Sequence, residues 1–293
     1  MWLVLAFLSA ALLGFYDVFK KKALGGNVVT VVLFLNTLFC SLLFLPFVGG
    51  IEFGGWEVQR YVVLKSLIVL SSWLCGYYGM KHLPLTLVGP INATRPVMVL
   101  VGALLVFGER LNVYQWIGVV LAIVSFFLLS RSGRREGIDF RHNRWVLCVV
   151  LAAVLGAVSG LYDKYLMAPV DAGGAGLNRL TVQCYFNFYQ CAIMGVMVGL
   201  LWFPKRGEGT ERFRWDWAIP LISIFLTAAD FVYFYALSHA DALVSVVSMI
   251  RRSSVVVSFV VGAFLFREKN LRSKAVDLAL VLLGMVFLYL GSR

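Results

Sequence analysis

The chain has 293 residues, of which 61% are hydrophobic and 14% are charged, and its mean hydropathy is +0.87. A soluble domain carries about 25% charged residues, so the composition excludes an ordinary soluble protein and predicts an all-α polytopic membrane protein. The net charge of +11 does not indicate nucleic-acid binding, because basic residues gather in short loops as membrane topology requires.

Ten apolar runs are long enough to be membrane helices, since a bilayer core about 30 Å thick needs about 20 residues. The first run lacks a basic segment before it, so we expect a retained helix there and not a signal peptide. The runs do not show the alternation of barrel strands. The predicted spans are 1–19, 28–48, 62–81, 85–106, 112–130, 145–168, 180–203, 216–237, 241–266 and 272–291.

The two halves of the chain repeat each other. Gly-Phe-Tyr-Asp at 14–17 returns as Gly-Leu-Tyr-Asp at 160–163, and Phe-Gly-Glu at 107–109 returns as Phe-Arg-Glu at 266–268. Five helices per repeat is an odd number, so the second copy must be inverted in the membrane, as in many secondary transporters. We predict a first repeat at 1–130, a basic connection at 131–144 and a second repeat at 145–293.

Basic residues predict the orientation. Loops after odd-numbered spans hold 17 Lys and Arg residues and the opposite side holds 6. The positive-inside rule then places the odd-numbered loops in the cytoplasm and both termini outside, in a cell membrane (inner or plasma).

Three arginines lie near the middle of apolar runs, Arg95 in the fourth run and Arg251 and Arg252 in the ninth. A charge at that depth is costly and usually faces a cavity with a partner or ligand. Aligning Tyr78 with Tyr235 pairs Arg95 with Arg252. Because the guanidinium fork suits oxyanions, we predict that these arginines bind an anionic substrate.

The alternative for Arg95 is an ion pair with an internal carboxylate such as Asp230 that only fixes packing. Asp230 is the deepest acid, and we expect a counter-ion, a proton carrier or a contact to a substrate amine. Asn92 lies beside Arg95 in a span that Pro90 and Pro96 loosen, and interrupted helices often mark transporter sites. Asn92 is therefore a candidate substrate ligand.

Ser248 lies one turn before Arg252 on the same helical face, and Tyr78 and Tyr235 could stack on or hydrogen-bond a substrate. For the tyrosines, packing or interface anchoring is the competing interpretation. These three residues complete the predicted substrate-binding set.

Asp17 and Asp163 occupy equivalent positions that inversion brings near opposite membrane faces. With Lys164 beside Asp163, they are candidates for gates at the two mouths of a cavity, and helix-end solvation is the alternative. Gly156-x3-Gly160 predicts close helix packing. Glu109 and Glu268 end their helices and are interpreted as structural anchors.

Five cysteines form no CxxC motif, and neither they nor the three histidines form a metal set. We therefore expect no cofactor and no bound metal.

These motifs resemble the drug/metabolite transporter (DMT) superfamily, especially its EamA-type ten-helix branch. The resemblance implies a carrier whose central cavity is lined largely by helices 1, 3, 4, 6, 8 and 9. The segment Ser-Met-Ile-Arg-Arg-Ser at 248–253 is also similar to plastid phosphate translocators, in which a Lys-Arg pair grips phosphate. That similarity implies anion-binding roles for Arg251, Arg252 and Lys164.

The leading hypothesis is a secondary transporter of a small phosphorylated or carboxylated metabolite, by alternating access around a midplane site. Two alternatives stay open: an exporter of amino acids or other zwitterions, with Asp230 meeting the amine, and a flippase for a lipid-linked phosphate. An intramembrane enzyme lacks support, because the sequence has no HExxH motif and no Ser/His pair at membrane depth. We expect membrane lipids as partners and a monomer or homodimer.

Overall fold

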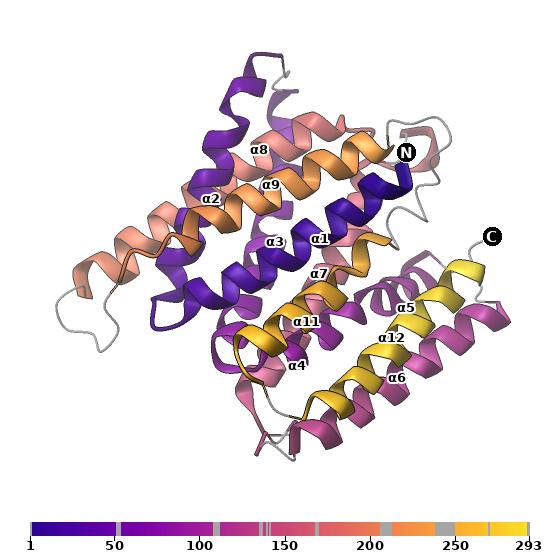
Figure 1. Ribbon diagram of the computed structural model, residues 1–293. Helices are drawn as coiled ribbons and strands as arrows, with labels where there is room; N and C mark the ends of the chain where they lie inside the picture. Colours follow the sequence, from indigo (N-terminus) through magenta and orange to yellow (C-terminus); the bar gives the residue numbers. More distant parts are fainter. Residues whose placement is uncertain are drawn as a thin grey trace.

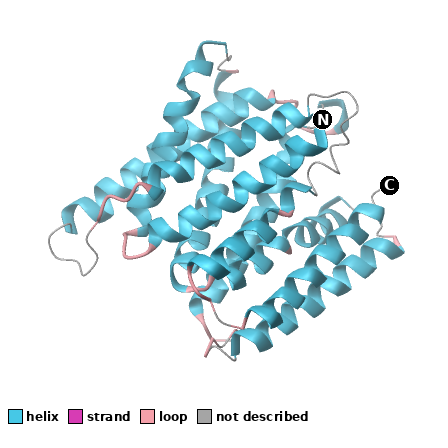
Figure 2. Ribbon diagram, in the orientation of Figure 1, coloured by secondary structure: helices cyan, strands magenta, loops and turns pink. Residues whose placement is uncertain are grey.

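The computed structural model describes residues 2–50, 54–107, 112–134, 137–138, 140, 142–167, 170–205, 213–237, 250–268 and 270–291. Over these residues the protein is helical and contains no strand (Figures 1 and 2). The helices are α1 (Trp2–Leu24), α2 (Val29–Phe44), α3 (Gly55–His82), α4 (Leu85–Ala93), α5 (Arg95–Phe107), α6 (Val113–Arg134), α7 (Arg144–Met167), α8 (Arg179–Met197), α9 (Ala218–Leu237), α11 (Ser254–Leu265) and α12 (Leu271–Gly291). Shorter turns of helix are η1 (Leu45–Gly50), η2 (Val170–Ala172), η3 (Val198–Trp202) and η4 (Phe203–Lys205).

Six of these helices are long and apolar enough to cross a membrane, and two shorter ones, Val29–Phe44 and Ala218–Tyr233, are also apolar. The multi-pass all-α fold predicted from the apolar runs is confirmed. The predicted fourth span is divided into α4 and α5. The predicted ninth span is described only from Ile250 onward, so its first part lies outside the described residues.

The helices pair in a pattern that is preserved when the two halves are exchanged. α1 packs on α9 and α7 packs on α3, while α2 contacts α9 and α8 contacts α3. The pairs α2–α8 and α6–α12 map onto themselves, and Figure 1 shows α6 lying alongside α12. This pattern is the two-fold relation of an inverted repeat of five plus five helices.

Small residues bring α6 and α12 close together. A Cβ atom on Gly118 would lie 2.8 Å from the carbonyl oxygen of Gly284, and the reverse distance is 3.1 Å. Ser125 Oγ donates to the carbonyl of Asp277 at 2.7 Å. Such contacts are how helices associate in lipid, where burying apolar surface gives little driving force.

The fourth and ninth predicted spans are interrupted by the same local structure, the fourth between α4 and α5 and the ninth just before α11. Thr94 N donates to the Ile91 carbonyl at 3.2 Å, and Ser253 N donates to the Ile250 carbonyl at 3.0 Å. The hydroxyl of each residue also donates to that carbonyl, at 2.7 Å for Thr94 and 2.6 Å for Ser253. These tightened i to i+3 turns place one arginine beside each interruption, Arg95 after Thr94 and Arg252 before Ser253.

Candidate functional site

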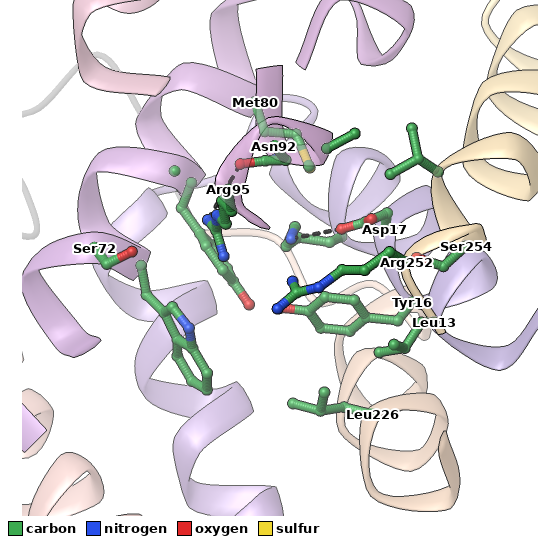
Figure 3. A pocket seen from close by; sticks show the side chains of 16 residues that line it. Leu13, Tyr16, Asp17, Ser72, Met80, Asn92, Arg95, Leu226, Arg252 and Ser254 are labelled. Carbon is green, nitrogen blue, oxygen red and sulfur yellow. Dashed lines mark hydrogen bonds and ion pairs between the residues drawn. The ribbon is translucent and has the colours of Figure 1, made fainter. Parts of the chain in front are cut away.

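A cavity of about 220 Å³ lies between the two interrupted helices. Figure 3 shows Arg95 and Arg252 reaching toward the same space from different helices. The lining residues come from α1, α3, the α4–α5 interruption, α9 and the start of α11: Leu13, Tyr16, Asp17, Lys20, Ser72, Trp73, Gly76, Tyr77, Met80, Asn92, Ala93, Arg95, Leu226, Arg252, Ser254 and Val255.

Arg252 projects into this cavity. Arg252 is exposed, whereas Ser254 and Val255, which also line the cavity, are buried. Among the described residues, no carboxylate lies within ion-pair distance of Arg252. Figure 3 shows its guanidinium extending toward Tyr16, so the positive charge is available to a ligand.

Arg95 is held more firmly. Its Nη2 donates to Oδ1 of Asn92 at 3.1 Å, and Figure 3 shows this bond at the edge of the cavity. Its Nε is buried without a hydrogen-bond partner in the described part of the chain. Asn92 is a neutral partner, and no carboxylate in the described part of the chain forms an ion pair with Arg95. The alternative interpretation, in which Arg95 pairs with Asp230, is wrong, because Asp230 pairs with Arg251.

Lys20 is the third cation at the cavity, and its charge is compensated. Its Nζ lies 2.8 Å from Oδ1 of Asp17, and it also lies 4.3 Å from the ring centre of Tyr16 and 5.3 Å from that of Tyr77. Asp17 therefore faces the cavity itself, paired within its own helix. Among the described lining residues, Arg95 and Arg252 thus give a formal excess of two positive charges.

Arg251 and Asp230 form an ion pair with each other. The Arg251 guanidinium also lies over the ring of Tyr233, 4.3 Å from its centre. Neither member of the pair lines the cavity. Successive residues on a helix point about 100° apart, which is why neighbouring arginines have different surroundings.

The other predicted residues have different locations. Tyr78 stacks on Trp145, with ring centres 6.3 Å apart, and Tyr235 is 52% exposed; neither lines the cavity. Ser248 lies outside the described residues, as does Glu109. Lys164 lies in α7, and the structure describes only its backbone.

Asp163 joins the two repeats. Its Oδ1 lies 2.5 Å from Nζ of Lys65, which links α7 to α3. A second contact lies at Met80, fifteen residues after Lys65 on α3, which is about 22 Å at 1.5 Å per residue. There Nζ of Lys21, on α1, donates to the carbonyls of Met80 at 2.5 Å and Leu83 at 2.6 Å. The cavity residues of α3, Ser72 to Met80, lie between or at these two contacts.

Several cavity residues were not in the predicted set. Tyr16 belongs to the repeated Gly-x-Tyr-Asp motif, which predicts a role for its aspartate but none for its tyrosine. On α3, Ser72, Gly76 and Met80 recur every four residues, as do Trp73 and Tyr77. Polar and aromatic residues on one face of an apolar helix are a signal that could have identified this wall of the cavity.

The interruptions also correct the register of the repeats. Their matching hydrogen bonds align Thr94 with Ser253, so the counterpart of Arg95 is Ser254 and that of Arg252 is Ala93. The predicted alignment, in which Arg95 and Arg252 are one position used twice, differs from this register by two residues. The two arginines flank equivalent interruptions from opposite sides.

Comparison with known proteins gives a family match over both halves. The model of the EamA-like transporter family matches residues 1–131 and 143–290. An uncharacterized transporter of Pseudomonas aeruginosa is 32% identical over 124 residues, which is 39% of this chain and 42% of that protein. An uncharacterized transporter of Archaeoglobus fulgidus is 27% identical over 35% of this chain and 38% of that protein. These matches thus span about two fifths of the relatives' length.

A third relative is a probable 4-amino-4-deoxy-L-arabinose-phosphoundecaprenol flippase subunit, ArnE, of Aeromonas salmonicida. It is 31% identical over 78 residues, which is 27% of this chain and 64% of that protein. A solved crystal structure overlays on 97% of this chain and 94% of its own with a TM-score of 0.60 at 15% identity, a likeness of fold alone. The local likeness to phosphate translocators stays a prediction.

Proposed function

The chain belongs to the EamA-like transporter family, and on that premise we propose that it is a secondary carrier of a small organic anion. The substrate binds in the cavity between the two repeats. It carries a phosphate or carboxylate group, and the repeats move around it so that the cavity opens alternately to the two sides of the membrane.

The observation that carries this proposal is the pair of uncompensated guanidinium groups. Arg95 contacts a neutral amide, Arg252 has no carboxylate partner among the described residues, and Lys20 is already paired with Asp17. Charges in the membrane interior are costly unless they meet a partner. An oxyanion is the partner that fits, because the guanidinium fork donates two parallel hydrogen bonds.

The size of the cavity favours a small substrate. Its volume of about 220 Å³ is below the roughly 300–1,000 Å³ of pockets for drug-sized ligands. The rings of Tyr16, Trp73 and Tyr77 form part of the lining and offer surface to the carbon skeleton of a metabolite.

The contacts around the cavity suit alternating access. The Lys65–Asp163 pair and the Lys21 contacts lie toward opposite ends of α3, and the first of them joins one repeat to the other. In this proposal such contacts form and break at the two mouths during the cycle, with Asp163 at one mouth and the end of α1 at the other. We place the odd-numbered loops in the cytoplasm and expect a monomer or homodimer in a cell membrane.

A flippase for a lipid-linked phosphate is the second candidate. The similarity to ArnE, a flippase subunit by name, favours it, and a phosphate of the lipid would meet the same arginines. The two candidates differ in whether the transported molecule has a membrane-embedded tail.

Flux into proteoliposomes tests the proposal. Purified protein is screened with phosphorylated and carboxylated metabolites, and Arg252→Gln is expected to reduce uptake at least about tenfold, the equivalent of one lost charge-assisted hydrogen bond. Arg272→Gln, an exposed charge at the start of α12, is the control and should transport normally. Uptake at the wild-type rate by Arg252→Gln would show that Arg252 does not bind the substrate. Transport of lipid-linked substrates alone would favour the flippase.

A further inference from the structure

Two glycines one turn apart on α7, Gly156 and Gly160, face different neighbours. A Cβ atom on Gly160 would lie 3.7 Å from Val99, an ordinary van der Waals contact. A Cβ atom on Gly156 would lie 3.0 Å from Cζ, 3.0 Å from Nη1 and 3.1 Å from Nε of Arg95. The space over Gly156 is therefore filled by a guanidinium group and not by the backbone of a neighbouring helix.

Arg95 is thus held between two helices. Asn92 accepts a hydrogen bond from Nη2, and the backbone of α7 at Gly156 lies against the opposite part of the same guanidinium. The first contact fixes one nitrogen, and the second sets how far the planar group can withdraw from the cavity. Together they define which edge of the fork faces the cavity.

The repeat provides an internal comparison. Aligning the repeated Gly-x-Tyr-Asp motifs at 14–17 and 160–163 makes Ala10 the counterpart of Gly156. Aligning the two helix interruptions makes Ser254 the counterpart of Arg95. The half that has a long arginine has glycine on the facing helix, and the half that has a short serine has alanine. This pairing by size is expected if the glycine exists to accommodate the arginine.

We infer that Gly156 is a positioning residue for anion binding: its missing side chain lets Arg95 lie against α7 and sets the point at which the guanidinium meets the substrate. This inference depends on the proposed function, because it assigns Arg95 to the substrate anion. It differs from the prediction that the Gly156-x3-Gly160 spacing serves close helix packing.

The substitution Gly156→Ala is mild for the fold and specific for the site. At contacts of 3.0–3.1 Å the neighbour must move by a few tenths of an ångström, and the neighbour is the flexible end of an arginine. We expect Arg95 to be displaced toward the cavity, while α7 itself stays in place. A shift of this size at a charge-assisted hydrogen bond is expected to raise the KM for transported inorganic phosphate about tenfold, with Vmax changed by less than about twofold.

Gly160→Ala is the matched control, since it adds the same methyl group one turn away at an ordinary contact. It should leave KM within about twofold of wild type. Thermal unfolding of both variants in detergent should match wild type, which separates positioning from packing. In an Arg95→Lys background, which keeps the positive charge without the planar fork, Gly156→Ala should change KM by less than about twofold.

A second measurement does not depend on transport. Phenylglyoxal reacts with accessible guanidinium groups, so mass spectrometry should show several-fold faster labelling of Arg95 in Gly156→Ala, with Arg252 as the internal reference. Unchanged KM together with unchanged Arg95 labelling overturns the inference, and so does an equal effect of Gly160→Ala. If Arg95 labelling rises but wild type neither binds nor transports inorganic phosphate or any of the phosphorylated and carboxylated metabolites of the screen, the proposed function fails and the positioning of Arg95 stands.

Discussion

At the scale of single residues, the neighbours Arg251 and Arg252 show how helical geometry assigns roles. Arg252 faces the cavity, whereas Arg251 is paired with Asp230 and covers Tyr233. The sequence indicates that buried arginines need partners, but it does not fix the rotation of the helix that carries them. The interruption at Ser253, directly after Arg252, also changes the direction of the helix there.

The Arg251–Asp230 pair leads to a prediction at this scale. Removing one partner, as in Asp230→Asn, leaves the other charge partly buried and should lower the free energy of unfolding by about 2 kcal/mol, below the range for fully buried pairs because each side chain is 20% exposed. The double variant Arg251→Gln with Asp230→Asn should recover most of that loss.

Thermal unfolding in detergent measures the loss and the recovery, and counterflow of the substrate measures function. The double variant should retain counterflow per folded molecule, because neither residue lines the cavity. Loss of counterflow with stability restored would instead place Asp230 at the substrate.

At the scale of elements, the interrupted helices separate what the sequence predicts from what it does not. Pro90 and Pro96 predict a loosened fourth span, since proline removes a backbone donor and disfavours helix before it. The described part of the ninth span contains no proline, yet it breaks at Ser253 in the same way. There, the Ser253 hydroxyl donates to the Ile250 carbonyl and competes with the regular hydrogen bonds of the helix. A serine in the sequence does not by itself predict such a break.

A cap on α4 gives the prediction at this scale. The carboxylate of Glu268 accepts hydrogen bonds from the backbone of Leu85 at 2.6 Å and of Thr86 at 2.9 Å, and it also accepts one from the Thr86 hydroxyl. Lys274, which is fully buried, donates to the same hydroxyl at 2.9 Å. Glu268 thus satisfies the free N–H groups at the start of α4 and neutralises the positive end of its dipole.

Glu268→Gln should therefore lower the free energy of unfolding by about 1–2 kcal/mol. Glu57→Gln is the comparison, because Glu57 also lies in a first helical turn but its side chain is 77% exposed; we expect a change below about 0.5 kcal/mol there. Equal changes for the two variants in thermal unfolding would rule out a capping role for Glu268.

At the scale of the whole molecule, the lengths of the apolar runs predict ten spans and the repeated motifs predict two inverted halves, because apolar length and repetition are both visible in the sequence. The pairing of helices across the halves was not visible. Lys65 and Asp163 lie far apart in the chain, so the sequence predicts a gate at Asp163 but does not identify its partner. The positions of the arginines within the apolar runs predict that they are functional. Only the packing of the helices shows that Arg95 and Arg252 line one cavity with Lys20.

The Lys65–Asp163 contact predicts that movement between α3 and α7 is required for transport. In a cysteine-free background, cysteines at both positions are linked by a bis-methanethiosulfonate reagent, which forms a disulfide with each thiol. The cross-link should abolish flux, and a thiol reductant, which cleaves both disulfides, should restore it. The same double-cysteine variant before cross-linking is the control, because it has already lost the Lys65–Asp163 ion pair, and its flux is the reference. Full activity of the cross-linked protein would mean that these helices do not separate during the cycle.

Arg95 and Arg252, which form no ion pair with a carboxylate in the described part of the chain, also affect the kinetics. Like charges in a poorly hydrated space repel each other, so closing the cavity around Arg95 and Arg252 is unfavourable when it is empty. A bound anion removes that repulsion and lowers the barrier to reorientation. The loaded carrier should then cross the membrane faster than the empty one, which makes one-for-one counter-exchange of anions faster than net transport in a single direction.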